Sequence, residues 1–291
     1  MSQNNTKLGV WLMVITTIVF AAQDGLSRHL AGEYNVLMVV MVRFWFFAAF
    51  VLALAKRQSG SVRAAAQSAR PWLQAFRGVL LSLEISVMVL AFVLLGLVES
   101  HAVFACYPLI VAALSGPVLG EQVGWRRWAA IAIGFVGVVI ILQPGYGVFS
   151  PKAIVPLIAA IMFALYSLLT RYVSYTDKAS TSFFWTGIMG AVAATIAGIW
   201  SWEPMSGQNW VLMGILCLTG VAGHWTLIKC YEAAEAGAVQ PFAYLQLVFA
   251  AAIGLLVFGE TLERHVAIGA AIVVCAGIFT LFRERASKSS A

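Results

Sequence analysis

Three long stretches without a charged side chain constrain the fold of this chain more than any other feature. Residues 128–151, 179–202 and 236–259 contain no Asp, Glu, Lys or Arg over 24 residues each. About 20 apolar residues in a helix cross the hydrocarbon core of a bilayer. The whole chain is 62% hydrophobic and 10% charged, against roughly 25% charged residues in soluble domains. Because the alternation of a membrane β-barrel is absent, the sequence predicts an all-α polytopic membrane protein.

Charged residues and Gly/Pro clusters mark the expected helix ends. They predict ten transmembrane helices joined by short loops, with no soluble domain. The first span follows Lys7 and continues through Gln23 and Asp24 without a small-residue cleavage site, so we interpret it as a retained helix and not as a signal peptide. The expected spans cover residues 8–29, 35–55, 73–97, 101–119, 127–143, 152–170, 182–201, 209–230, 237–258 and 265–282.

Lys and Arg are unequally distributed over the expected loops. With the N-terminus inside, fourteen lie on the inner side, three (Arg28, Lys152 and Arg264) lie on the outer side, and Arg43 lies inside the second span. Basic residues favour cytoplasmic loops. We therefore expect both termini in the cytoplasm. The net formal charge of +6 is then explained by membrane orientation and needs no nucleic-acid partner.

The chain contains an internal repeat. Residues 20–28 match residues 163–171 at an offset of 143, and residues 118–121 match residues 257–260 at an offset of 139. Each half, residues 1–145 and 146–291, is therefore expected to hold five spans. Since five is odd, the second half enters the membrane from the opposite face, and the halves form inverted repeats. Inverted repeats are typical of transporters that work by alternating access.

With these features the chain resembles the EamA family of the drug/metabolite transporter superfamily. The resemblance covers nearly the whole chain and rests on two five-helix halves, each with Gly-Glu at the end of its fourth helix (Gly120-Glu121 and Gly259-Glu260) before a Gly/Ala-rich fifth helix. Within the family the chain looks most like bacterial exporters of amino acids, particularly aromatic ones. The resemblance implies a central cavity between the halves and a place in the bacterial inner membrane. We expect each Glu of the pairs near the N-terminal end of the following helix.

Ionisable side chains at bilayer depth usually face a cavity or a partner. Glu84 lies in an apolar span and no charged residue follows it for 14 positions. It either meets a substrate ammonium or carries a proton, or else it holds His224 or a backbone group. His224, Trp225 and Lys229 share the eighth span, where cavity lining is favoured. Lys229 alternatively extends to the inner headgroups.

Two expected spans of equivalent position contain proline. Tyr107-Pro108 lies in the fourth span, Pro241 lies in the ninth, and Tyr107 and Gln246 correspond under the 139 offset. A proline inside a span frees a carbonyl that protein or cavity water must satisfy. These spans are therefore either cavity walls or ordinarily kinked helices.

Aromatic side chains within the spans form a second group of candidates. Each of Tyr107, Tyr166, Trp185, Trp225 and Tyr244 is expected to pack against its neighbours. As a set they indicate a roomy substrate site that tolerates several neutral or zwitterionic solutes.

Charged residues near the outer ends of the first two spans are predicted to pair. Asp24 and Arg28 lie one turn apart on one helix face, and Arg43 lies in the next span. We interpret the three as an ion-pair cluster, with an outer gate as the alternative role. Arg77, near the cytoplasmic start of the third span, is expected to extend to the headgroups.

The sequence gives little support to an enzyme. It has no P-loop, GxGxxG, HExxH or GxSxG setting, and its four cysteines lack metal-ligand spacing, so no cofactor or metal is expected. The leading hypothesis is a secondary exporter of amino acids with broad specificity, acting as a monomer or homodimer in the bilayer. Glu84 or backbone carbonyls would bind the substrate ammonium, and Gln246, His224 or Lys229 its carboxylate. The alternatives are a multidrug exporter of hydrophobic cations, a lipid flippase, or a membrane scaffold that transports nothing.

Overall fold

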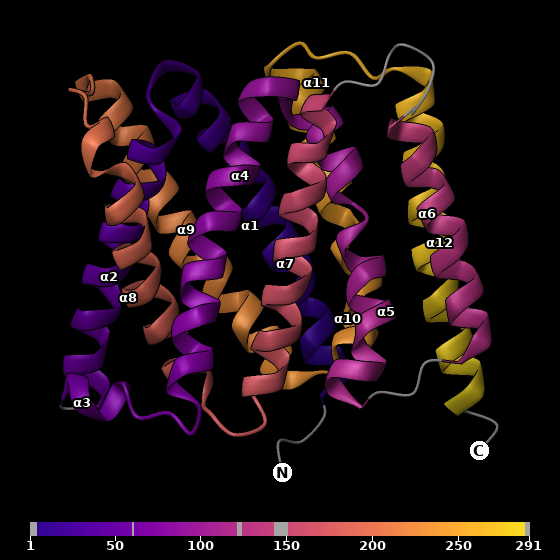
Figure 1. The fold of residues 1–291 in the computed structure, drawn as a ribbon, viewed down its shortest axis with the longest axis horizontal. Coiled ribbons are helices and arrows are strands. Elements are labelled where there is room, and N and C mark those ends of the chain that lie inside the picture. The colour runs from indigo at the N-terminus through magenta and orange to yellow at the C-terminus, as the bar shows by residue number, and fades with distance from the viewer. Residues whose placement is uncertain (1–4, 60, 121–123, 143–150, 289–291) are drawn as a thin grey trace.

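The computed structural model describes residues 5–59, 61–120, 124–142 and 151–288, and all regular elements within these ranges are helical (Figure 1). The elements are α1 (Thr6–Glu33), α2 (Val36–Ser59), α3 (Val62–Ala65), α4 (Pro71–Phe104), α5 (Tyr107–Leu119), α6 (Trp125–Leu142), the 3-10 turn η1 (Pro151–Ala153), α7 (Ile154–Val173), α8 (Ala179–Gly198), the 3-10 turn η2 (Ile199–Ser201), α9 (Gly207–Ala233), α10 (Ala236–Ala243), α11 (Leu245–Val257) and α12 (Arg264–Lys288).

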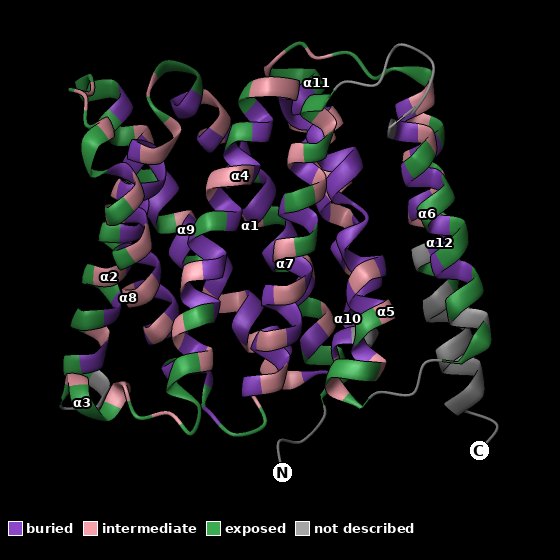
Figure 2. Ribbon diagram, viewed as in Figure 1, coloured by how far each residue is buried: buried purple, intermediate pink, exposed green. Residues whose placement is uncertain are grey.

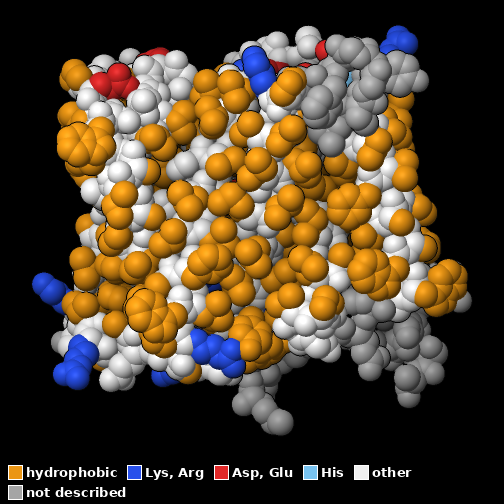
Figure 3. Space-filling model, in the orientation of Figure 1, with side chains coloured by type: hydrophobic (Ala, Val, Ile, Leu, Met, Phe, Trp, Pro, Cys, Tyr) orange, Lys and Arg blue, Asp and Glu red, His pale blue; other side chains and the backbone are white. Residues whose placement is uncertain are grey.

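The helices form a bundle with an apolar outer surface. Within the described ranges, seven segments are long and apolar enough to cross a membrane, and three shorter apolar helices accompany them. About half of each long segment is buried inside the protein, so that buried and exposed positions alternate around the helices (Figure 2). The exposed positions are apolar as well, since Trp72, Trp200 and Leu256 are 87%, 91% and 85% exposed, and hydrophobic side chains cover the side of the bundle (Figure 3). Such a surface suits lipid, and the chain is a multi-pass membrane protein.

The helices run between two edges of the bundle. We call the edge at which α1 begins and α12 ends the lower edge, as it lies in Figure 1, and the other the upper edge. Basic side chains mark the lower edge, where α2 ends in Lys56 and Arg57, α3 contains Arg63, and Arg70 precedes α4 (Figure 3). The predicted positions of these four residues near one membrane face agree with this placement.

Helices from the two halves of the sequence pack against one another. The most extensive contacts pair α1 with α9, α2 with α8, α4 with α7, and α6 with α12. Each pair joins one helix that precedes residue 146 with one that follows it. The interior of the bundle is therefore formed jointly by both halves.

Three breaks interrupt the helices that surround the centre. Within α4, Gly96 has φ 82° and ψ 179°, which only glycine adopts readily, and the chain turns back there at the upper edge (Figure 1). A turn at Ala105 and Cys106 separates α4 from α5, and Tyr244 separates α10 from α11. The break at Gly96 falls inside the expected span 73–97, one residue before its end. The break at residues 105–106 lies two residues before Pro108, and the break at Tyr244 lies three residues after Pro241, so these two interrupt the expected spans 101–119 and 237–258.

Glu260 fixes the turn at Gly96, which corrects the expected role of the second Gly-Glu pair. Its carboxylate accepts the amide protons of Leu97 and Val98 at 2.8 and 2.7 Å and forms an ion pair with Arg28 of α1. Glu260 therefore caps the second segment of α4 and not the helix that follows it, because the turn brings those free amides to the end of α11. Glu121, of the first pair, lies outside the described residues.

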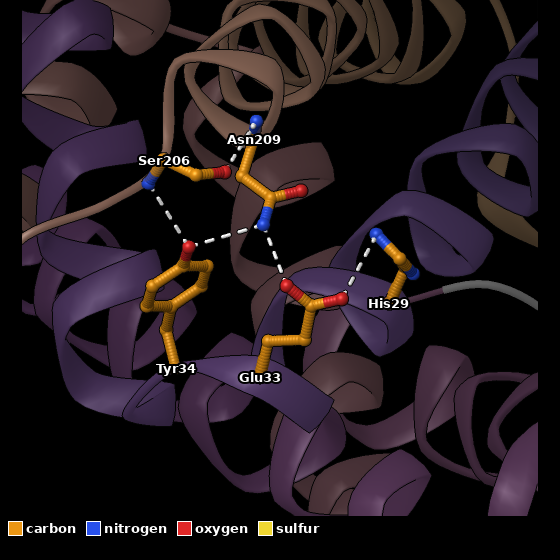
Figure 4. A network of polar contacts seen from close by, with 5 residues as sticks. All are labelled: His29, Glu33, Tyr34, Ser206 and Asn209. Carbon is orange, nitrogen blue, oxygen red and sulfur yellow. Dashed lines mark hydrogen bonds and ion pairs between the residues drawn. The ribbon is translucent and has the colours of Figure 1, made fainter.

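A second polar network joins the halves at the upper edge (Figure 4). The Nδ2 group of Asn209 donates to Glu33 at 2.6 Å and to the Tyr34 hydroxyl at 3.0 Å. The same hydroxyl accepts the backbone N–H of Ser206 at 3.1 Å, and the Glu33 carboxylate lies 3.6 Å from His29 Nε2. The end of α1 is thereby held to the start of α9.

Candidate functional site

A small cavity of about 30 Å³ lies at the centre of the bundle. We call it the central cavity. All of its lining residues are buried, so the structure corresponds to a form that is closed toward both edges. The lining residues are Phe20, Gln23 and Asp24 of α1, Arg43 of α2, Glu84, Ile85, Met88, Val89, Phe92 and Phe104 of α4, Phe163 of α7, His224 of α9 and Gln246 of α11.

Helical spacing explains why these side chains converge. In α1, Phe20, Gln23 and Asp24 are three and four residues apart and so share one face. In α4, Glu84 and Met88 are likewise one turn apart. The remaining faces of both helices pack against neighbouring helices or face outward, which leaves the polar stripe directed at the centre.

Asp24 is the acidic centre of one polar cluster. Its Oδ2 atom lies 3.1 Å from His101 Nε2 and accepts the amide N–H of Gln246 at 3.0 Å. The three residues come from α1, α4 and α11. The predicted ion pair between Asp24 and Arg28 does not form, because Arg28 turns toward Glu260 and Phe258 while Asp24 turns inward.

Arg43 is the basic centre of a second polar cluster. Its Nη2 group donates to Gln23 Oε1 at 3.0 Å and lies 3.3 Å from His224 Nε2. Arg43 is 4% exposed, and His224 is stacked against Phe47 and tilted against Phe20. The guanidinium is therefore held in the cavity wall and cannot extend to the headgroups.

Glu84 lies in the wall and forms no hydrogen bond or ion pair with any described residue. It is 3% exposed and interacts electrostatically with Asp24 and Arg43. The sequence left a choice between cavity lining and pairing with His224. The structure brings Glu84, His224 and Gln246 to the same cavity. The partner of His224 there is Arg43 and not Glu84.

A smaller space of about 10 Å³ adjoins the central cavity, and Phe104 and Gln246 line both. We call it the side pocket. It lies where the breaks at residues 105–106 and at Tyr244 meet. Its walls consist of His101, Phe104, Ala105, Tyr107, Pro108, Ala243, Tyr244, Gln246 and Leu247. Two of the predicted aromatic residues, Tyr107 and Tyr244, are thus placed here.

Other predicted site residues lie away from both cavities. Tyr166 is fully buried, with the Arg77 guanidinium 5.2 Å from its ring centroid. The Trp185 indole donates to the Ala66 carbonyl at 3.1 Å, so it holds the segment after α3 against α8. Trp225 packs edge-on against a phenylalanine ring, and Lys229 forms an ion pair with Glu232 at 2.6 Å.

Arg77 does not reach the headgroups, contrary to the prediction from the sequence. Its side chain is fully buried and donates to Gln74 Oε1 at 2.9 Å, Thr170 Oγ1 at 3.0 Å and the Ser182 carbonyl at 2.5 Å. Gln74 in turn donates to Asp177 at 2.8 Å. These contacts join α4 to α7 and α8 near the lower edge, and a conformation reaching the headgroups would lose all of them.

Sequence reasoning missed two residues of the central region, His101 and Gln23. His101 carried a usable signal, since residues 100–120 contain no Asp, Glu, Lys or Arg and an ionisable ring in such a stretch calls for a partner. Gln23 carried none, because a neutral amide near a helix end is compatible with many environments. Among the described residues, no group of three or more His, Cys, Asp or Glu side chains is placed to hold a metal.

A bundle of apolar helices around a buried cavity of mixed charge defines a membrane transporter of small molecules. The chain belongs to the EamA-like transporter family, whose profile matches residues 7–143 and again residues 151–282. This is a family of transporters and not of enzymes.

Curated relatives agree with this assignment. The S-adenosylmethionine uptake transporter of Rickettsia prowazekii (strain Madrid E) is 25% identical over 97% of this chain and 95% of its own. The riboflavin transporter of Vibrio cholerae serotype O1 is 33% identical over 62% of this chain and 61% of its own. The pseudopaline exporter of Pseudomonas aeruginosa is 24% identical over 94% of this chain and 95% of its own. One crystal structure superposes with a TM-score of 0.66 over 94% of this chain and 97% of its own at 19% identity, and shows the same fold.

Proposed function

We propose that this protein is a secondary transporter that moves a small zwitterionic organic solute through the central cavity. The observation that carries the proposal is the presence of both charge signs, Asp24 and Glu84 against Arg43, in one buried space. Fixed charges at bilayer depth are costly and usually mark a substrate or ion pathway. A solute with an ammonium and a carboxylate group complements such a wall.

The two ends of the solute are assigned different partners. Glu84 binds the ammonium, because no described side chain occupies its carboxylate. Arg43 binds the carboxylate, since a guanidinium has five N–H donors in a fixed fork and only one of its described contacts is to an acceptor oxygen. Gln246 and His224 remain candidate partners for the carboxylate. Lys229 is no longer one, because it pairs with Glu232 outside the cavity.

Transport is proposed to occur by alternating access of ten spans arranged as inverted five-helix halves, residues 1–145 and 146–291. The two separate matches to the family profile support a duplicated chain, and the interleaved helix pairs support a shared interior. The contacts at Glu260 close the upper edge and those around Arg77 close the lower edge. One set has to break for the cavity to open on one side.

The proposed location is the bacterial inner membrane with both termini in the cytoplasm, since the basic residues of α2 and α3 lie at the edge where α1 begins and α12 ends. Amino-acid export is one form of the proposed function. Movement of larger solutes that contain an amino-acid group is the other, and the relative named for S-adenosylmethionine favours it. Export of hydrophobic cations, the second candidate suggested by the aromatic wall, is disfavoured by the fixed positive charge of Arg43.

Counterflow in proteoliposomes tests the proposal. The panel contains methionine, phenylalanine, S-adenosylmethionine, riboflavin and the lipophilic cation tetraphenylphosphonium. We expect counterflow of at least one zwitterionic member, and its loss in Glu84→Gln. The matched control is Glu263→Gln, which changes an exposed carboxylate paired with His265. Counterflow of tetraphenylphosphonium alone, or equal fluxes in wild type and Glu84→Gln, would contradict the proposal.

A further inference from the structure

A larger cavity lies at the lower edge of the bundle, where α3 contacts both the end of α2 and the start of α8 (Figure 1). We call it the edge pocket. Its volume is about 330 Å³, against about 30 Å³ for the central cavity. Sites for small organic molecules typically have about 300–1,000 Å³, so the edge pocket has room for such a group.

The edge pocket stays unfilled because α3 lines it with small side chains. Ala64 and Ala65 are the residues that α3 contributes, and their methyl groups fill little of the space between α2 and α8. The chain that follows α3 is fixed to α8, since the Ala66 carbonyl accepts the indole N–H of Trp185 at 3.1 Å. Asp177 accepts a backbone N–H of the same segment at 2.9 Å. The pocket is therefore bounded by chain that is held in place.

One end of the edge pocket is polar and positively charged. Lys178, Ser180 and Thr181 line it at the start of α8. Lys178 is exposed, and its ammonium forms no ion pair with any described residue. Lys56 and Arg57, at the end of α2, add positive charge at the same edge. The potential at this end of the pocket therefore favours an anion.

The carboxylates near the start of α8 do not neutralise Lys178. Asp177 accepts the amide N–H of Gln74 at 2.8 Å. Glu232 pairs with Lys229 at 2.6 Å and accepts the first backbone N–H of α8 at 3.0 Å. Both carboxylates thus have their own partners, and the ammonium of Lys178 is available to an anion from outside the chain.

The other end of the edge pocket is apolar and lies deeper in the bundle. Phe183 and Phe184 follow the start of α8 by about one turn, and Val51 and Leu54 precede the end of α2 by one to two turns. Because a helix rises about 1.5 Å per residue, these side chains lie roughly 6 Å or more inward from the charged end. A phospholipid has the same order of groups, with a phosphate at the membrane surface and acyl chains below it.

We infer that the edge pocket binds one anionic phospholipid of the surrounding bilayer. The phosphate contacts the ammonium of Lys178 and the hydroxyls of Ser180 and Thr181, and an acyl chain packs against Leu54 and Phe184. Free inorganic phosphate has the same charge but would leave the apolar end in contact with water, which is unfavourable. A zwitterionic lipid carries its own cation beside the phosphate and gains less from Lys178.

The edge pocket is separate from the central cavity, because no residue lines both. Binding of the lipid is therefore independent of the solute that the protein moves.

The test measures binding of radiolabelled phosphatidylglycerol to the delipidated full-length protein in a neutral detergent. Phosphatidylcholine with the same acyl chains and inorganic phosphate serve as competitors. Lys178→Gln removes the charge inside the pocket, and Lys178→Arg keeps it. The matched control is Lys56→Gln, which removes an exposed charge at the same edge but outside the pocket lining. Ala64→Phe, at an exposed position of α3, fills the pocket without any change of charge.

We expect one tightly bound phosphatidylglycerol per protein, displaced weakly by phosphatidylcholine and not by phosphate. Lys178→Gln should weaken binding about fivefold, the effect of one lysine near an anionic lipid. Lys178→Arg and Lys56→Gln should change it less than about twofold. Ala64→Phe should remove the tightly bound lipid, because its ring occupies the same space. Melting temperatures close to that of the wild type show that the variants are folded.

Four results would overturn the inference. Displacement by phosphate would assign the pocket to a soluble anion, and equal competition by phosphatidylcholine would make it a general lipid contact. An equal loss in Lys178→Gln and Lys56→Gln would show that only the overall charge of the edge matters. Undiminished binding to Ala64→Phe would place the lipid elsewhere on the protein.

Discussion

Gln246 of α11 donates its amide N–H to the carboxylate of Asp24 in α1 at 3.0 Å. The two residues are 222 positions apart in the chain and belong to different halves. Asp24 also faces His101 of α4, so a single carboxylate joins three helices at the junction of the central cavity and the side pocket. Any opening of the cavity between α1 and α11 has to break this contact.

Removing the Gln246 amide should destabilise the closed form. Gln246→Leu keeps the approximate volume but leaves one Asp24 contact unmade, at a cost of about 1–2 kcal/mol. We expect the apparent melting temperature in detergent to fall by a few degrees, since about 1 kcal/mol corresponds to about 2–4 °C in a protein of this size class. Gln67→Leu, at an exposed position, serves as the control. Equal melting temperatures for both variants and the wild type would show that the contact is not formed in solution.

Arg77 is predicted to be essential for packing at the lower edge. Arg77→Met removes donors from Gln74, Thr170 and the Ser182 carbonyl together, and a hydrogen bond to a charged group contributes about 1.5–3 kcal/mol. The variant should therefore lose more stability than Arg63→Met, which changes an exposed arginine of α3. Thermal unfolding measured by tryptophan fluorescence decides the matter, and a similar loss for both variants would contradict the buried placement.

Gly96 is predicted to tolerate no side chain. A Cβ atom there would lie 2.6 Å from Glu260 Oε1. The residue also has φ 82° and ψ 179°, a conformation that costs residues other than glycine about 1–3 kcal/mol. Gly96→Ala should lower both the melting temperature and counterflow. Gly32→Ala places a methyl group in open space on α1 and should be neutral or slightly stabilising. A Gly96→Ala variant with the melting temperature and counterflow of the wild type would show that the turn is absent.

Tyr34, between α1 and α2, should lose its phenolic proton at a lower pH than an ordinary tyrosine. The backbone N–H of Ser206 and then the amide of Asn209 lower the pKa of Tyr34 below its usual value of 10.0, against the opposing charge of Glu33. A depressed pKa means that ionisation strengthens these bonds. Tyr34 should therefore add stability above pH 10, and this addition should be lost as the pH falls through the lowered pKa.

The difference in phenolate absorbance between wild type and Tyr34→Phe isolates this group from the other seven tyrosines. We expect its titration midpoint below pH 10. A midpoint at or above 10 would mean that the network of Figure 4 is not formed.

The sequence was most informative about where the helices lie. The charge-free stretches predicted the helices because bilayer thickness and backbone hydrogen bonding leave few alternatives. The prolines at 108 and 241 lie two and three residues from observed breaks. The sequence did not predict that the chain turns back at Gly96 or that Glu260 holds this turn. That contact depends on how α4 folds over α11, which no local pattern encodes.

The candidate site was only partly accessible to sequence reasoning. Glu84, His224 and Gln246 stood out because ionisable and amide groups are rare at bilayer depth, and all three line the central cavity. Lys229 stood out for the same reason and lies elsewhere. Its partner Glu232 is one turn away, and periodicity alone does not decide whether a charged residue turns toward the cavity or along its own helix. Partners such as those of Arg77, from three helices, follow from tertiary packing alone.

Thiol labelling of Met88 tests most directly whether the central cavity is the solute pathway. Met88 lines the cavity and is 6% exposed. In a background with the four native cysteines replaced, Met88→Cys in proteoliposomes is treated with a membrane-impermeant thiol reagent, added to either side. Alternating access predicts slow labelling from both sides that a transported solute suppresses. Labelling from neither side, or labelling that no counterflow substrate affects, would contradict the account.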